Sequence, residues 1–343
     1  KSRFPGSSEI IAKNRFGAAD GGIVNRPVSW LIAVMPYIDQ SAVYKSWNDT
    51  RNRVYFKTNN NNSLSRSGFA SSTGNHIPSI NNLLCPSDIS LGNSISSSGL
   101  PAPETSYVAN AGMARTKYSQ YHPKVIRNPS LKGKIIPLSK ADGIFLDLVS
   151  PSSKSMTFRA TDLVDGATQT LMLSENMQAT YYCKAGFNYN FTQQGHDINK
   201  TLQTTINLNN NTLMTGPSAI GANLMYWQWW NEVAPSDDTP VLNPIFTHFI
   251  NGRGATDLGN DLSAAYLAQT YPNIIPYFAA GVMARPSSMH TAGVNAVFAD
   301  GHTQFLSEDI EYTIYQALMT PDTSNSNMPN NDYILKGSDY GTP

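Results

Sequence analysis

Residues 293–306 carry the strongest structural constraint in the sequence, because they have the pattern of a β-hairpin. Apolar residues alternate with others as far as Asp300-Gly301, and a second alternating run follows. The Asp-Gly pair favours a two-residue type I′ turn, whose twist matches that of antiparallel strands. In that register Val297 faces Gln304. The chain is therefore expected to contain an antiparallel sheet.

Other stretches complete an expected α+β fold. Residues 27–47 carry apolar side chains at helical spacing, with Ser29 as a cap, and Pro36 should divide them into two short helices, the second starting near this proline. Short strands are expected at residues 83–85, 105–112 and 169–175, and a helical segment from residue 310 should end near Pro321.

Stretches rich in Asn and Ser indicate how the domain is organised. The sequence contains 33 Asn among 343 residues, and Asn favours turns over helices. We expect one globular domain over residues 1–320, with surface insertions at about 57–75 and 188–215. Residues 321–343 are expected to form a mobile or clamped tail.

The charge of the chain argues against nucleic-acid binding. The 24 Lys and Arg balance the 24 Asp and Glu, and only 14% of residues are charged, against about 25% in ordinary domains. No basic excess is present to release counterions from phosphates. No apolar run approaches the roughly 18 residues of a membrane span. We therefore expect a soluble chain without a nucleic-acid partner.

Two cysteines, Cys85 and Cys183, admit two interpretations, of which a disulfide is the leading one. A disulfide between them would close a loop of about 98 residues, worth about 4 to 5 kcal/mol by the chain-entropy estimate. The alternative is two buried free thiols. Neither cysteine belongs to a CxxC pair and no His stands at zinc-finger spacing, which argues against a structural zinc site.

The sequence offers little support for catalysis. His290 and Asp300 are separated by ten residues of strand, about 33 Å, so they cannot form a dyad if the hairpin is straight. The same geometry places His290 near Glu311. No hydrolase elbow, dinucleotide loop or HExxH pattern occurs. We expect no enzyme; an unfamiliar site at His290, Glu311 or Asp300 is the minority alternative.

Calcium and glycan sites are weak candidates. Asp162 with Asp165, and Asp300 with loop carbonyls, could supply the oxygen ligands that Ca²⁺ prefers, although ordinary Asp-Gly turns are the favoured explanation. We expect no other cofactor. Glycan acceptor sequences occur at Asn48, Asn61, Asn190, Asn199 and Asn210, several of them expected by chance in an Asn-rich chain.

An aromatic cluster supplies a second functional hypothesis. It consists of Tyr226, Trp227, Trp229 and Trp230. Exposed indoles would form a platform for a sugar or another flat ligand. Core packing is the simpler interpretation of the same residues.

Several blocks together resemble one family. They are Arg3-Phe4-Pro5-Gly6, Ser29-Trp30, Pro36-Tyr37-Ile38-Asp39-Gln40, Leu84-Cys85-Pro86-Ser87-Asp88, Ser106-Tyr107, Asp142-Gly143-Ile144-Phe145, residues 162–175, and residues 285–301 with His290, Asp300 and Gly301. These blocks resemble the prepilin-like, type II secretion pseudopilin-like proteins of planctomycete type, which carry a His-(nine residues)-Asp-Gly signature and the domain of unknown function 1559.

The resemblance implies a function without catalysis. It implies an α+β pilin-like head with an antiparallel sheet, short amino-terminal helices and Asn/Ser-rich loops, exported through a prepilin-type pathway. The apolar spine helix of the family is missing before Lys1. We expect an extracellular or cell-surface subunit of a pilus- or pseudopilus-like filament, with itself, other pilin-like subunits and possible glycans as partners. The alternative is an extracellular carbohydrate- or solute-binding module.

Overall fold

The fold is that of a computed structural model. It describes residues 3–9, 13–14, 24–25, 28–48, 78–88, 104–113, 123–132, 134, 136–137, 139–146, 148, 156–176, 179, 182, 206–207, 212–213, 223–227, 250–252 and 285–341. Both expected insertions, apart from four residues in two short strands, lie outside these ranges.

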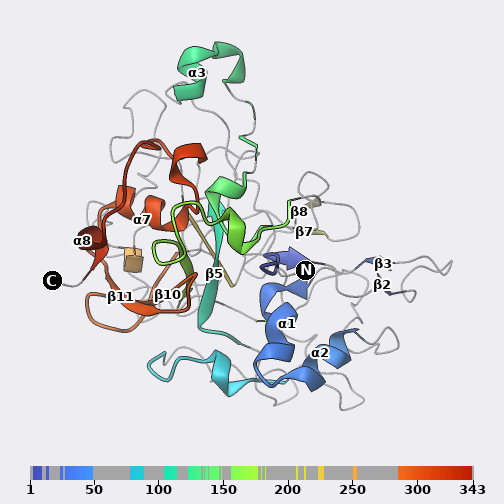
Figure 1. The fold of residues 1–343 in the computed structure, drawn as a ribbon. Helices are drawn as coiled ribbons and strands as arrows, with labels where there is room; N and C mark the ends of the chain where they lie inside the picture. Colours follow the sequence, from blue (N-terminus) through green and yellow to red (C-terminus); the bar gives the residue numbers. More distant parts are fainter. Residues whose placement is uncertain are drawn as a thin grey trace.

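A five-stranded mixed sheet forms the centre of the described structure (Figure 1). Its order is β11 (Thr303–Ser307), β10 (Gly293–Phe298), β6 (Leu171–Glu175), β5 (Tyr107–Met113) and β9 (Leu224–Trp227). Neighbouring strands are antiparallel except β5 and β9, which are parallel. The α+β class and the strands expected at 105–112 and 169–175 are confirmed. The sheet is mixed and not purely antiparallel, because β5 and β9 are parallel.

The hairpin β10–β11 forms, but with a different turn from the expected one. Val297 pairs with Thr303, one residue away from the expected Gln304. The Gly301 N–H donates to the Phe298 carbonyl at 2.9 Å, and only Gly301 of the loop has a positive φ, of 93°. A three-residue loop with glycine in the left-handed position replaces the type I′ turn.

The amino-terminal helices follow the sequence closely. Helix α1 (Trp30–Val34) begins after Ser29, whose hydroxyl accepts from the Ile32 N–H, as expected of a cap. A 3-10 turn, η1 (Met35–Tyr37), contains the proline, and α2 (Ser41–Asn48) begins five residues later than Pro36. The expected strand at residues 83–85 is wrong, because η3 (Asn81–Leu83) and a turn occupy that stretch.

Two apolar clusters cover the two faces of the sheet. Ala109 and Leu224 belong to the cluster that holds α1 and α2, whereas their neighbours Val108 and Met225 belong to the cluster that holds α7 (Tyr312–Met319). This alternation follows the two-residue period of strands. In Figure 1, α1 and α7 lie on opposite sides of β5.

The described amino-terminal residues are bound to the domain. The Phe4 ring lies edge-on to Phe145 and Phe158, at centroid distances of 6.3 and 5.6 Å. The Ser7 N–H donates to the Leu146 carbonyl at 2.9 Å. Strand β1 (Ser8–Glu9) pairs with β4 (Val28–Ser29), just before α1. Short pairs also join β2 (Lys13–Asn14) to β3 (Val24–Asn25) and β7 (Ile206–Asn207) to β8 (Thr212–Leu213).

The carboxyl-terminal segment is clamped to the sheet. The Asn327 N–H and side-chain amide donate to the two carboxylate oxygens of Asp142, each at 2.7 Å. The Tyr340 ring stacks on Phe298 of β10 at 5.6 Å. Two short helices, η12 (Thr323–Asn325) and α8 (Gly337–Tyr340), lie in this segment.

Helix α3 (Pro123–Arg127) projects at the top of Figure 1. Among the described residues, no helix has the length and apolarity to span a bilayer.

Candidate functional site

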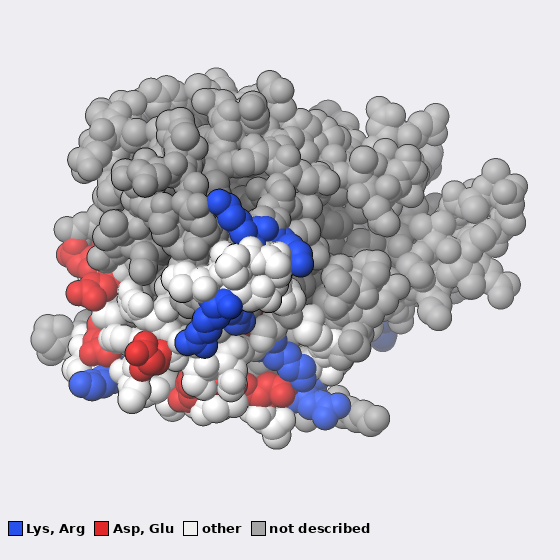
Figure 2. Space-filling view, turned by 90° about the horizontal axis from the view of Figure 1, so that it is seen from above, with Lys and Arg blue, Asp and Glu red and all other residues white. Residues whose placement is uncertain are grey.

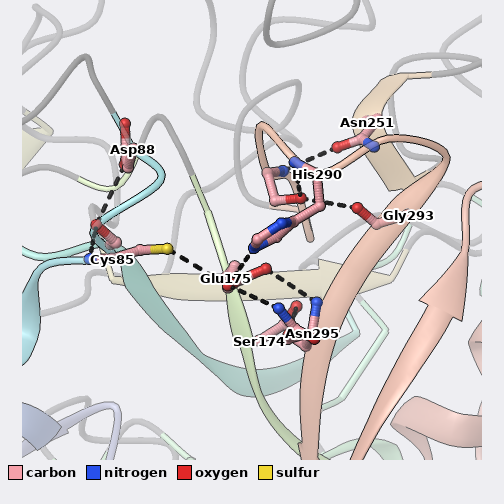
Figure 3. Close-up of polar contacts among 10 residues, drawn as sticks. Cys85, Asp88, Ser174, Glu175, Asn251, His290, Gly293 and Asn295 are labelled. Carbon is pink, nitrogen blue, oxygen red and sulfur yellow. Dashed lines mark hydrogen bonds and ion pairs between the residues drawn. The ribbon is translucent and has the colours of Figure 1, made fainter.

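Three side chains with different chemistry converge at one end of the sheet. Cys85 follows η3, Glu175 ends β6, and His290 precedes β10. The Glu175 Oε1 atom lies 3.6 Å from Cys85 Sγ and 3.3 Å from His290 Nε2. The three donor atoms all lie within 4.8 Å of one another. Figure 3 shows the His290 ring and the Cys85 sulfur both pointing toward Glu175.

The carboxylate of Glu175 is held in a fixed orientation. Its Oε2 accepts from the Asn295 N–H at 2.9 Å, and its Oε1 accepts from the Asn295 side-chain amide at 3.2 Å. The Glu175 side chain is only 8% exposed, so both bonds lie largely out of water. Because β10 pairs with β6, the sheet itself brings Asn295 to Glu175. The carboxylate is therefore preorganised by the strand pairing.

The cysteine is half-buried beside polar side chains. The Cys85 N–H donates to Ser106 Oγ at 2.9 Å, and the Ser106 hydroxyl donates to Asp88 at 3.2 Å. Burial raises the pKa of the Cys85 thiol, and the nearby Glu175 charge acts in the same direction. Burial, followed by the charges of Cys85 and Glu175, also raises the pKa of Tyr107. These shifts favour the protonated thiol at neutral pH.

The loop that carries His290 is braced by its own hydrogen bonds. The Ser288 hydroxyl accepts from the His290 N–H at 3.0 Å and donates to the Gly293 carbonyl at 2.7 Å. The Ser288 N–H donates to Asn251 Oδ1 at 2.9 Å. Ala292, in the same loop, has a φ of 65°. The His290 side chain is 33% exposed, so this corner of the cluster faces solvent.

A small hollow adjoins the cluster. Its cavity volume is about 10 Å³, and its lining includes Cys85, Asp88 and Glu175. A space of this size holds about one water molecule. The hollow therefore has room for a single water or small ion.

Two expectations for the site residues are corrected. The prediction that His290 contacts Glu311 is wrong. The hairpin register and the loop at residues 289–292 turn the imidazole toward Glu175 instead. The expected disulfide of Cys85 is also not found, because this thiol is free and contacts Glu175. Cys183 lies outside the described residues. His290 and Asp300 have separate partners, and Asp300 Oδ1 lies 2.6 Å from His302 Nδ1.

The aspartates suggested for calcium do not converge. Asp162 accepts from the Arg159 N–H at 2.8 Å and from Lys140 Nζ at 3.1 Å. Asp165 accepts from the Thr323 N–H and hydroxyl. With Asp300 at His302, each carboxylate has its own local partner, and calcium at Asp162 with Asp165, or at Asp300 with loop carbonyls, stays a prediction.

The aromatic platform is wrong for two of its four members. Trp227 is fully buried in β9, where its indole N–H donates to the Asp142 carbonyl at 2.8 Å, and Tyr226 is 8% exposed. Trp229 and Trp230 lie outside the described residues. Of the glycan candidates, Asn48 is the last residue of α2. The others are outside the described residues: Asn61, Asn190, Asn199 and Asn210.

Sequence reasoning did not anticipate the role of Glu175. It placed this residue at the end of a strand and found no elbow around it. A signal was nevertheless present, because Cys85, Glu175 and His290 each belong to a different block of the family resemblance. Blocks far apart in sequence that all carry metal-binding or ionisable side chains are candidates for one site.

Comparison with known proteins gives one match. The model of a family described as "Protein of unknown function (DUF1559)" matches residues 3–313. No curated protein and no solved structure matches the chain.

Proposed function

Because the chain belongs to the DUF1559 family of proteins of unknown function, its role has to be argued from its own residues, and we propose that it is a structural subunit of a pilus- or pseudopilus-like filament. In this proposal it lies outside the cell or on its surface, is exported by a prepilin-type pathway, and acts by assembling with copies of itself or with other pilin-like subunits. It needs no catalysis.

The separation of charge along the chain carries this proposal. Residues 123–140 contain five Lys and Arg and no acidic residue, although the whole chain is neutral. Residues 300–341 contain seven Asp and Glu and one Lys. In Figure 2, several Lys and Arg side chains lie together near the centre of the view, and the acidic side chains lie to the left and along the lower edge, with further Lys and Arg side chains among them. The zero net charge hid this separation from the composition analysis.

Separated charges favour contacts between copies of the same chain. The basic segment of one copy attracts the acidic segment of another, while the neutral total avoids long-range repulsion. A contact between two different patches is heterologous, and repeating it without closure builds a filament. Ionic strength screens such contacts, with a Debye length of about 8 Å at physiological salt. Assembly should therefore weaken as salt rises.

The docking of the amino-terminal residues also supports a filament subunit. A head that is held by the part of the chain before it must be joined to that part firmly. Arg3 forms an ion pair with Glu9 at 3.0 Å, Phe4 inserts between two aromatic rings, and β1 pairs with β4. A pull on residue 3 is thereby transmitted through β1 and β4 to α1.

Electron microscopy of the native material, with an antibody against this chain, tests the proposal. We expect ordered filaments labelled along their length. In the purified full-length protein, combining Arg127→Glu with Lys134→Glu should reduce assembly, because it reverses two exposed charges, one at the end of α3 and one after it. Lys45→Glu, on the exposed face of α2, is the matched control and should assemble normally.

A different result would overturn the proposal. Full-length protein that remains a monodisperse monomer at low salt, together with native material without labelled filaments, contradicts it. The carbohydrate-binding alternative has lost support, because Tyr226 and Trp227 are buried. The hollow beside Glu175 likewise gives no support to an enzyme acting on an organic substrate.

A further inference from the structure

Cys85, Glu175 and His290 offer three donor atoms of the kinds that zinc-class ions prefer. They supply one sulfur, one carboxylate oxygen and one imidazole nitrogen, all within 4.8 Å of one another. Zn²⁺ takes this mixture of ligands, whereas Ca²⁺ and Mg²⁺ prefer oxygen alone. Because one ligand is a thiol, the site should prefer a borderline-soft divalent transition metal.

The distances fit a tetrahedral metal site. With metal–ligand bonds of about 2.0 to 2.3 Å, neighbouring ligands of a tetrahedral zinc ion lie roughly 3.3 to 3.8 Å apart. The Glu175 oxygen lies 3.3 Å from the His290 nitrogen and 3.6 Å from the Cys85 sulfur. Two of the three edges already have this length, and the third, between sulfur and nitrogen, is no longer than 4.8 Å.

Contacts around the ligands resemble the support that metal sites require. Asn295 holds the carboxylate through two hydrogen bonds, Ser106 accepts from the Cys85 N–H, and Ser288 accepts from the His290 N–H. Such outer contacts orient ligands and maintain affinity. The adjacent hollow of about 10 Å³ has room for a water as fourth ligand.

We propose that Cys85, Glu175 and His290 bind one zinc-class divalent ion, with a water in the hollow as the fourth ligand. The ion joins three segments of the chain, separated by 90 and 115 residues, and so cross-links them. Binding displaces the thiol proton to solvent, leaving a thiolate on the metal. The proposal is independent of filament assembly, because a monomer contains all three ligands.

Cobalt titration of the full chain without an affinity tag tests the site. After chelator treatment and dialysis, Co²⁺ should bind at one equivalent with a thiolate-to-metal charge-transfer band, and Zn²⁺ should abolish that band. One proton should be released per ion from Cys85. Free zinc should also raise the unfolding temperature in a concentration-dependent way, because it binds the folded state.

Variants separate this site from adventitious binding. Cys85→Ser and His290→Ala should abolish the charge-transfer band, whereas Cys183→Ser and His302→Ala should keep it. Asn295→Ala retains all three ligands and should weaken binding about 10- to 100-fold. Circular dichroism of each variant establishes that it has folded.

Two results would overturn the proposal. One is wild-type protein that binds no Co²⁺ or Zn²⁺ at micromolar concentration, a result that does not depend on whether any variant folds. The other is an unchanged charge-transfer band in folded Cys85→Ser. Filaments that form normally in chelator would leave the metal proposal intact, since binding is measured on the monomer.

Discussion

At the scale of single residues, Asn110 joins three parts of the molecule. Its side-chain amide donates to the Leu171 carbonyl at 2.7 Å and to the Met319 carbonyl at 2.8 Å, and its oxygen accepts from the Gly112 N–H at 2.9 Å. The residue is fully buried. Strand β5 is thereby tied to β6 and to the end of α7.

Removing this side chain should be costly. Asn110→Ala leaves two carbonyls and one N–H without these partners in the core, at about 1 to 3 kcal/mol for each such group. We expect the free energy of unfolding to fall by about 3 kcal/mol or more in urea titration. Asn128→Ala removes an exposed cap of η4 (Pro129–Leu131) and should cost about 1 kcal/mol. Equal losses in the two variants would contradict the assigned role of Asn110.

Asp142 should make stability depend on pH. Burial raises the pKa of this carboxyl to about 6, and the hydrogen bonds from Asn327 only partly oppose the shift. The folded state therefore holds the proton more tightly than the unfolded state, and this contribution to stability is full below about pH 4. It is lost as pH rises to about 6, by roughly 3 kcal/mol.

The difference between wild type and Asp142→Asn isolates this effect. Urea titrations at intervals from pH 4 to pH 7 should show the wild type losing stability relative to the variant over that range. Because the other ionisable groups are common to both proteins, their contributions cancel in the comparison. Parallel curves for the two proteins would show that Asp142 does not titrate in this window.

At the scale of elements, the β10–β11 hairpin contains two glycines that are required for different reasons, one for its backbone conformation and one for the space around it. Gly301 has a φ of 93° but open space where an alanine methyl group would lie, so Gly301→Ala should cost about 1 kcal/mol in backbone strain alone. A Cβ at Gly293 would lie 2.1 Å from the Leu306 carbonyl oxygen. Gly293→Ala should therefore separate the two strands and cost about 2 to 3 kcal/mol.

Thermal unfolding of the two variants tests which substitution destabilises the protein more. Gly293→Ala should melt at the lower temperature. Because the two substitutions are chemically identical and lie in the same hairpin, the intrinsic effect of adding a methyl group is common to both. A lower melting temperature for Gly301→Ala would show that turn strain outweighs strand spacing.

Local patterns predicted the elements better than their connections. The alternation around Val297 and the cap at Ser29 are properties of neighbouring residues, and both the hairpin and α1 formed. The turn was misjudged because Asp-Gly suits both a two-residue loop and a three-residue loop that ends in glycine. Residues 83–85 looked like a strand because short apolar runs do not distinguish strands from turns.

The candidate site depended on long-range pairing, which local patterns do not show. Glu175 meets His290 because β6 pairs with β10, and the sequence contains no signal for that choice of neighbour. The same limit applies to the parallel edge of the sheet, where β5 pairs with β9. Chemical residue types were visible in the sequence, whereas their meeting point was not.

At the scale of the whole molecule, residues 321–341 are an integral part of the packing. Met328 is buried, Asn327 donates hydrogen bonds to the Asp142 carboxylate, and Tyr340 stacks on Phe298. Deleting residues 321–343 should expose this part of the core and lower the unfolding temperature by several degrees or abolish cooperative unfolding. Deleting only residues 342–343 is the control. Unchanged melting of the longer deletion would mean that the segment adds no stability.

The strand order has a consequence for how the chain reaches its fold. Strand β9 follows β6 in sequence but lies at the edge of the sheet, beyond β5. Strand β6 pairs with β5 on one side and with β10 on the other, and β10 comes much later in the chain. Within the five-stranded sheet, only β10 and β11 join through a short loop, so most of its pairings close long stretches of chain, which slows folding. A nascent chain emerging from the ribosome holds β5 and β6 with incomplete partners until residue 298 has been made. Export before folding, or a chaperone that shields these strand edges, would protect the chain from aggregation during that interval.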